Sequence, residues 1–317
     1  MLRYILNRVI YLLPVLFFIS VVVFLFIHLM PGDPVDYMMG TEATAEARNA
    51  LRVELGLHRH ILVQYFIWAG KVATGDFGKS IINSQPVLKI IFDKFPATLI
   101  LALAATVVSL LIALLAGTFA AVHQGTWKDL GALILALLWV SIPTFWLGIM
   151  LMLLLSLYWP LFPTVGYVSP FVDLRGALHH LILPAITLGA VLAGAITRLC
   201  RSEMIEQLNK DYITTAKAKG LSPWEVNYKH ALRNALISVV TFTGLQLGTL
   251  LGGAVVVEQI FAWPGLGLLV IQSIFARDYP VVQGIVLFMA FIFVFVNLLV
   301  DISYTWLNPQ IRLERKE

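Results

Sequence analysis

The sequence predicts an all-α transmembrane fold with six membrane-spanning helices. Hydrophobic residues make up 59% of its 317 residues, whereas charged residues make up only 13%. A helix needs about 20 apolar residues to cross a bilayer. In lipid each such segment must satisfy its own backbone hydrogen bonds, which favours helices, and the alternating segments of a β-barrel are missing. The six predicted spans are Val9–Leu29, Ala97–Ala121, Leu130–Tyr158, Leu181–Leu199, Leu236–Val257 and Val281–Tyr304.

The first span has the basic start of a signal peptide, with Arg3 and Arg8 before its apolar part. That part exceeds the roughly 7–15 residues of a signal peptide, and no small-residue cleavage site precedes Met30–Pro34. We therefore expect residues 1–30 to form a cytoplasmic N-terminus and a retained first membrane helix.

Residues 31–96, between the first and second spans, predict a folded extracytoplasmic loop region. Thr44–Leu55 has the pattern of a short helix that ends at Gly56. Ile61–Val72 has apolar residues at helical spacing, which predicts a helix on the membrane surface or against the spans. The cluster Gly75–Gly78 predicts a turn.

The lysines and arginines of the short loops predict the orientation, because cytoplasmic loops carry an excess of positive charge. Six spans put both termini on one side, together with Lys128, the basic residues from Arg198 to Arg233 and those of residues 308–317. The opposite side has only Arg175 and Arg277 in its short loops. Both termini are therefore predicted to be cytoplasmic. The net charge of +4 reflects this bias and does not indicate nucleic-acid binding.

A polar segment, residues 201–235, separates the fourth and fifth spans. Asp211 is a favourable N-cap and Gly220 a favourable C-terminal stop, which predicts a helix of about two turns between them. Ser222–Glu225 has the pattern of a capping box with proline at the first helical position. The helix that starts there is predicted to run through His230 into the fifth span.

The short helix of this segment has two interpretations, which the residues leave open. Small side chains would let it seat deeply in a groove of another protein; they are Thr214, Thr215, Ala216 and Ala218. The alternative is a solvated amphipathic helix on anionic lipid.

The loop before the sixth span has a pattern of its own. A sharp turn at an interfacial tryptophan is predicted by Trp263, Pro264, Gly265 and Gly267. Leu266–Arg277 then has room for a short apolar helix that lies in the interface or dips into the membrane; the alternative is a plain surface loop. Asp278, Tyr279 and Pro280 are predicted to lead the chain into the last span.

Ionisable residues are nearly absent from the interiors of the predicted spans, since His28, Glu258 and Asp301 fall near span ends. Transporters that couple to ions or protons usually keep such groups at mid-membrane depth. Selective channels need charged rings or a carbonyl filter. The sequence therefore disfavours both classes.

Motifs of enzymes, cofactors and metals are incomplete. Residues 73–80 approach the phosphate-binding pattern G-x-x-x-x-G-K-S, but Ala73 stands where its first glycine is required. His58 with His60, and His179 with His180, have no further ligands at metal spacing. We expect no enzymatic activity and no cofactor or metal in this chain. A pathway without its own motor, with one docking element, predicts a separate cytoplasmic motor protein.

Seven short segments of the chain form an ordered set: LMPGDP at 29–34, LGL at 55–57, DYITTAKAKG at 211–220, HALRNA at 230–235, WPGLG at 263–267, RDYPVVQG at 277–284 and NPQIR at 308–312. Together they resemble the permease subunit of a binding-protein-dependent ABC importer in the dipeptide/oligopeptide/nickel group. The resemblance covers nearly the whole chain.

The resemblance implies roles for several residues. Residues 201–235 correspond to the EAA loop of the family, and its short helix to the coupling helix that sits in a cleft of the ATPase subunit. The residues implied in coupling are Asp211, Tyr212, Thr214, Thr215, Ala216, Gly220 and Leu221. Residues 97–307 correspond to a permease core of five helices, and residues 308–317 to a cytoplasmic tail.

The same resemblance implies partners and a location in the inner membrane of a prokaryote. The partners are a second homologous permease, two cytoplasmic ATPase subunits that bind ATP and Mg²⁺, and an extracytoplasmic substrate-binding protein. The expected cargo is a short peptide, because His, Cys and Met do not cluster along any span. Nickel, a metal chelate or a glutathione-like solute stays an alternative, as does a membrane scaffold that transports nothing.

Overall fold

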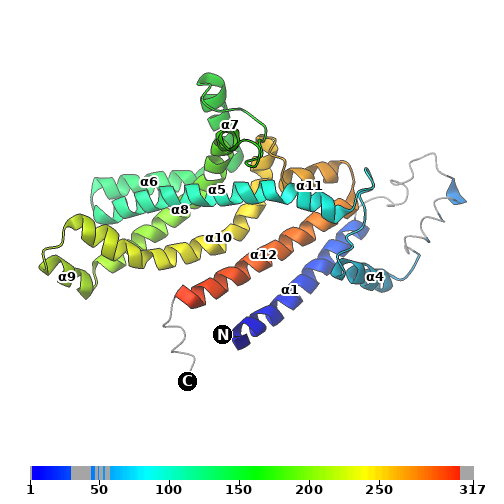
Figure 1. Cartoon of the computed structure of the whole chain (residues 1–317), viewed down its shortest axis with the longest axis horizontal. Helices are drawn as coiled ribbons and strands as arrows, with labels where there is room; N and C mark the ends of the chain where they lie inside the picture. Colours follow the sequence, from blue (N-terminus) through cyan, green and yellow to red (C-terminus); the bar gives the residue numbers. More distant parts are fainter. Residues whose placement is uncertain (1, 30–43, 47–48, 50–52, 54–57, 308–317) are drawn as a thin grey trace. The chain divides into compact units, whose positions relative to one another are not determined.

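The regular structure of the protein is helical in the residues that the computed structural model describes, which are 2–29, 44–46, 49, 53 and 58–307 (Figure 1). The predicted all-α class is therefore confirmed. The helix expected over Thr44–Leu55 lies mostly outside the described residues. The segments at 29–34, 55–57 and 308–312 that carried part of the family resemblance also lie mostly or wholly outside them.

The helices form two compact units. The first comprises Met1–Pro96 and Leu269–Val294, and the second comprises Ala97–Leu268 and Phe295–Glu317. Three helices run from one unit into the other along the chain: α5 (Val87–Val122), α11 (Leu266–Phe275) and α12 (Tyr279–Leu307). The short helix predicted after the Trp263–Gly267 turn is confirmed as α11.

In the first unit, helix α4 (Ile61–Ala73) packs on α1 (Leu2–Leu29) through aromatic residues, with Tyr65 at the centre of the contact. Tyr65 is buried, and its hydroxyl shares a 2.8 Å hydrogen bond with the hydroxyl of Ser20. Its ring meets Phe24 edge-on at a centroid distance of 5.4 Å. The predicted helix over Ile61–Val72 is confirmed, and it lies against α1.

The first unit also holds a loop, residues 78–86, against the start of α12. The hydroxyl of Ser80 donates to the carboxylate of Asp278, and the backbone N–H of Ile81 donates to the same carboxylate at 3.1 Å. Ser80 and Asp278 are both buried. The predicted turn is confirmed, because Gly75 and Gly78 have φ values of +86° and +81°.

Helix α8 (Leu174–Leu208) is the central helix of the second unit. It packs against α5 and against α6 (Trp127–Ser141), α7 (Thr144–Met152) and α10 (Arg233–Ile260). Two glycines permit close approach. A side-chain carbon at Gly189 would lie 2.5 Å from the carbonyl oxygen of Ala105 on α5. At Gly194 it would collide with the carbonyl oxygen of Ala136 on α6. Close backbone packing of this kind is how helices associate inside membranes.

The third predicted span is not one continuous helix. Over Leu130–Tyr158 the chain bends by 99°, with α6 on one side and α7 followed by the π-helix η1 (Leu153–Tyr158) on the other. The break falls at Ile142 and Pro143, which are extended, with ψ of 125° and 131°. Proline disfavours the helical conformation in the residue before it and has no N–H to donate, so the helix ends there.

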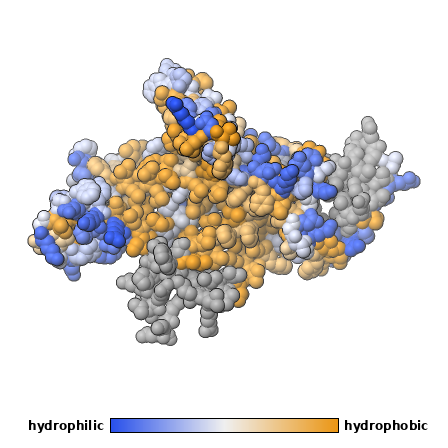
Figure 2. Space-filling model, viewed as in Figure 1, coloured by the Kyte–Doolittle hydropathy of each residue, from blue (hydrophilic) through white to orange (hydrophobic). Residues whose placement is uncertain are grey.

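Four helices of the described residues are long and apolar enough to cross a membrane, or five if the bent pair forms one span. The four are Val87–Val122, Leu174–Leu208, Glu225–Ile260 and Tyr279–Val300. In the second unit, hydrophobic residues cover α10 and its neighbours, whereas hydrophilic residues gather at the end that carries the short helix α9 (Figure 2). This end contains the polar segment 201–235.

Candidate functional site

Helix α9 (Asp211–Ala218) is the short helix that the polar segment predicts, with eight residues in two turns. It begins one residue earlier than expected, because Lys210 occupies the cap position and Asp211 is already the first helical residue. There the Asp211 carboxylate still favours the positive end of the helix dipole. Gly220 follows the end of the helix with φ of +78°, which confirms the predicted stop.

The two faces of α9 differ sharply. Ile213 and Ala216 are buried in the hydrophobic core of the second unit, in the same cluster as Met204 and Val226. Thr214 and Thr215 are exposed on the other face. Leu221, just after the turn, packs against the same core. Of the predicted coupling residues Thr214, Thr215 and Ala216, the two threonines are therefore available to a partner, whereas Ala216 serves internal packing.

Tyr212 ties α9 to both neighbouring helices. Its hydroxyl donates a 2.9 Å hydrogen bond to the side-chain oxygen of Gln207, near the end of α8. It also accepts a 3.1 Å bond from the side-chain amide of Asn234, at the start of α10. Sequence reasoning named Tyr212 but missed Gln207 and Asn234. Their only signal is that a polar amide stands on each flank of the short helix.

The predicted capping box is confirmed. The backbone N–H of Ser222 donates to the Glu225 carboxylate at 3.1 Å, and the N–H of Glu225 donates to the Ser222 hydroxyl at 3.3 Å. The helix then runs without interruption into α10, as expected, but its first part is the π-helix η2 (Glu225–Leu232). π-Helical segments are rare and are often found at functional sites.

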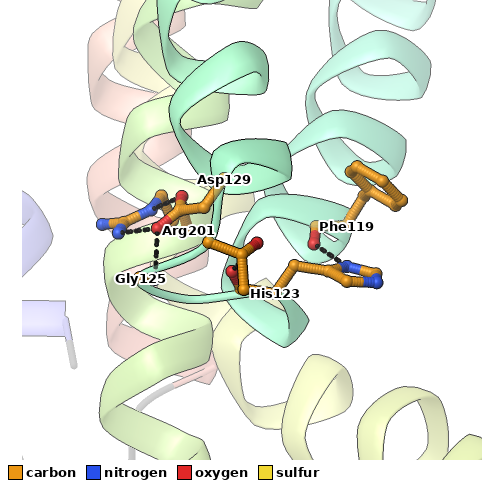
Figure 3. A network of polar contacts seen from close by, with 6 residues as sticks. Phe119, His123, Gly125, Asp129 and Arg201 are labelled. Carbon is orange, nitrogen blue, oxygen red and sulfur yellow. Dashed lines mark hydrogen bonds and ion pairs between the residues drawn. The ribbon is translucent and has the colours of Figure 1, made fainter.

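An ion pair holds the last turns of α8, just before α9, to the start of α6 (Figure 3). Arg201 donates to the carboxylate of Asp129 from Nε at 2.6 Å and from Nη2 at 2.7 Å. The backbone N–H of Gly125 donates to the same carboxylate at 3.0 Å. Asp129 is buried. The sequence showed Arg201 only as part of a positive region and gave no sign of its partner.

Trp263 is buried inside the subunit, with only 1% of its surface exposed. Its indole N–H donates to the carbonyl oxygen of Ala97 at 2.8 Å, and the ring of Tyr167 meets it edge-on at 4.8 Å. A buried indole needs a hydrogen-bond partner, and a backbone carbonyl within α5 provides one. The turn at Trp263 is confirmed, but it lies inside the second unit.

Glu258 explains the glycines of this turn. The carboxylate is fully buried and accepts a 2.7 Å bond from the Thr98 hydroxyl and a 2.9 Å bond from the N–H of Leu268. Gly265 and Gly267 lie directly against it, and a side-chain carbon at either position would collide with Glu258 or its helix. Sequence reasoning placed Glu258 near a span end and gave it no role.

The predicted residues Asp278, Tyr279 and Pro280 belong to the first unit. Asp278 holds the 78–86 loop as described above, Tyr279 is buried, and Pro280 lies in the first turn of α12, where its missing N–H costs nothing. The predicted start of the last helix is confirmed. The structure therefore divides the predicted residues into a surface at α9, a buried turn at Trp263 and a helix start at Asp278.

Comparison with known proteins identifies two matching families. Residues 113–313 match the family described as "Binding-protein-dependent transport system inner membrane component", and residues 1–102 match the N-terminal family of the same transport system membrane components. A putative peptide transport system permease protein of Brucella abortus (strain 2308) is 45% identical over 311 residues, which cover 98% of this chain and 99% of the relative. The glutathione transport system permease protein GsiC of Salmonella typhimurium (strain LT2) is 43% identical over 312 residues, with the same coverage of each chain.

Proposed function

Because the chain belongs to the family of binding-protein-dependent ABC importer permeases, in the dipeptide/oligopeptide/nickel group, we propose that it forms half of a membrane pathway for short peptides. The family is the membrane component of transport systems that also have an ATPase and a substrate-binding protein. The chain is accordingly a transport subunit, and the ATP that drives transport is bound by the partner ATPase subunits.

The surface that couples this permease to its ATPase is α9 and the turn that follows it. The observation that carries this assignment is the division of α9 into a buried face, with Ile213 and Ala216, and an exposed face, with Thr214 and Thr215. Small exposed side chains let the backbone of the helix come close to the partner. Tyr212 joins the helix to α8 and α10 by hydrogen bonds, so a push on α9 reaches both.

The membrane topology that fits this role has six spans with both termini in the cytoplasm. It counts α1 as the first span and the bent pair α6 and α7 as the third, in addition to the four long apolar helices. It also places α9 on the same side as the termini, where an ATPase is present. Two ATPase subunits and a second, homologous permease complete the assembly.

The proposed cargo follows from the relatives. One is named for peptide transport and the other for glutathione, which is itself a short peptide. A glutathione-like solute is therefore the second candidate, favoured by the GsiC similarity. Nickel and metal chelates are the third class that the assay below includes.

Uptake into proteoliposomes tests the proposal. The vesicles would hold this chain, its partner permease and the ATPase subunits, with the loaded binding protein outside and ATP inside. We expect ATP-dependent accumulation of labelled di- to pentapeptides, and a loss of accumulation with Thr215→Arg. Uptake of glutathione or of a nickel chelate alone would correct the cargo. If no solute accumulated above the ATP-free vesicles, the chain would be a scaffold and the proposal would be wrong.

A further inference from the structure

We infer that Trp224 and Tyr228 form a second contact with the ATPase subunit, beside α9, and that an apolar pocket with an acidic rim receives them. The inference rests on the proposed function. Trp224 is 67% exposed and Tyr228 is 42% exposed, although both are large aromatic side chains. Their rings stack on each other with centroids 5.6 Å apart and an angle of 30° between the planes.

The position of the pair is fixed before any partner arrives. Trp224 lies inside the capping box, between Ser222 and Glu225, which bond to each other in both directions. Tyr228 follows one turn later in η2. Because the backbone is held and the two rings restrict each other, the aromatic pair loses little conformational entropy when a partner covers it. Exposed Trp and Tyr side chains in such settings often dominate the energy of an interface.

A lipid surface does not fit these residues. The apolar part of the helix begins at Leu236, twelve residues after Trp224. At roughly 1.5 Å per residue, Trp224 lies about 18 Å along the helix from that point. The headgroup layer beyond the hydrocarbon core is only about 5–8 Å thick on each side. A helix tilt of about 20° shortens the height of Trp224 by less than a tenth. Trp224 therefore lies beyond the headgroups, where a soluble protein is the available partner.

The neighbouring charges describe the partner surface. Lys217 and Lys219 on the α9 side and Lys229 on η2 are all exposed. Glu225 is the only acidic residue of segment 217–230, so this segment carries a net positive charge. The pocket that receives the aromatic pair is therefore expected to have acidic residues at its rim. The exposed face of α9 and the aromatic pair are separated only by the turn at Gly220 and Leu221, so one partner surface can cover both.

The test measures the affinity of the nanodisc-embedded permease pair for the ATPase subunit of its own system. We expect Trp224→Ala to weaken binding about 10- to 30-fold and Trp224→Phe to retain most of it. Trp159→Ala is the matched control, because Trp159 is another exposed tryptophan (54%) far along the chain from the capping box, and it should change nothing. A photoreactive phenylalanine at position 224 should cross-link to the ATPase subunit.

The outcomes separate the two proposals. If Thr215→Arg weakened binding but Trp224→Ala and Tyr228→Ala did not, docking through α9 would stand and the aromatic contact would be wrong. A cross-link to lipid in place of the ATPase subunit would also overturn it. If Trp224→Ala weakened binding but Thr215→Arg did not, the aromatic contact would stand and docking through α9 would be wrong. If none of the three variants altered binding, both would be wrong.

Discussion

Thr98 and Glu258, 160 positions apart in the chain, meet in a buried hydrogen bond of 2.7 Å between α5 and the end of α10. The Thr98 hydroxyl also accepts a 2.8 Å bond from the backbone N–H of Leu266, at the start of α11. One threonine and one carboxylate thus satisfy the backbone of the turn that joins α10 to α11. The turn is held by residues outside it as well as by its own proline and glycines.

Glu258→Ala should destabilise the protein by about 2–3 kcal/mol, because it leaves the Thr98 hydroxyl and the Leu268 N–H without their buried acceptor. Thermal unfolding of the purified chain in detergent measures this. Glu206→Gln, at an exposed carboxylate, is the control and should have little effect. The effects of Glu258→Ala and Thr98→Val should not add in the double variant, since both act on one network. Full additivity would contradict the network.

Gly267→Ala should strongly reduce the yield of folded protein. A side-chain carbon there would lie 2.5 Å from Cα of Val255 and 3.0 Å from the Glu258 carboxylate, and backbone cannot move away cheaply. Gly252→Ala is the matched control, because Gly252 lies in α10 with nothing within 4 Å of the added carbon. It should be neutral or slightly stabilising, since alanine favours helices. Size-exclusion profiles of the two variants and of the wild-type protein, each expressed separately under the same conditions, measure the difference in folded yield.

Asp129→Ala should cost about 1–3 kcal/mol, because Arg201 loses both charge-assisted hydrogen bonds and Gly125 loses its acceptor. Arg201→Lys should retain little of the stability that the pair contributes, since lysine cannot make the paired contact. The exposed pair Lys210–Glu206 is the comparison and should contribute well under 1 kcal/mol. A double-mutant cycle on unfolding temperature gives the coupling for each pair. Equal coupling in both pairs would show that burial of Asp129 adds nothing.

Thr215→Arg and Ala216→Glu should fail for different reasons, although the residues are adjacent. Thr215 is exposed, so Thr215→Arg should leave the unfolding temperature unchanged while abolishing stimulation of the ATPase by loaded binding protein. Ala216 is buried, so Ala216→Glu should lower the unfolding temperature itself. Thr215→Ala is the mild control for both measurements. A lower unfolding temperature of Thr215→Arg would show that Thr215 does not lie on the exposed face of α9.

Asp278→Ala should loosen the 78–86 loop without unfolding the first unit. The substitution removes the acceptor of the Ser80 hydroxyl and of the Ile81 N–H. Hydrogen exchange at residues 78–86 should become faster, by tenfold or more if about 1.4 kcal/mol of local stability is lost. Asp93→Ala, at an exposed carboxylate, is the control and should leave exchange in this loop unchanged.

Local signals in the sequence predicted the local structure well. The Ser222–Glu225 box, the stop at Gly220 and the helix start at Tyr279 are determined by residues within a few positions of each other. The family resemblance also pointed to the short helix α9, because the motif that carries the resemblance includes it. The assignment of coupling to Thr214 and Thr215 stays a prediction.

Contacts between distant segments could not be predicted in this way. The residues around Trp263 do not reveal that its ring is buried, because its partners Ala97 and Tyr167 are far away in the chain. Asp129 and Arg201 pair across 72 positions. The bend at Pro143 was also missed. The segment around it is apolar and long enough to cross a membrane, and a membrane helix can tolerate a proline in its interior.

The glycines of α8 limit how this subunit can respond to force. With the backbones of α5 and α6 in direct contact at Gly189 and Gly194, α8 cannot slide along either helix without a steric collision. Tyr212 and Ile213 in turn fix α9 to the same body. We therefore expect a displacement applied to α9 to move α8, α6 and the adjoining part of α5 together as one rigid body, with any bending elsewhere in the subunit.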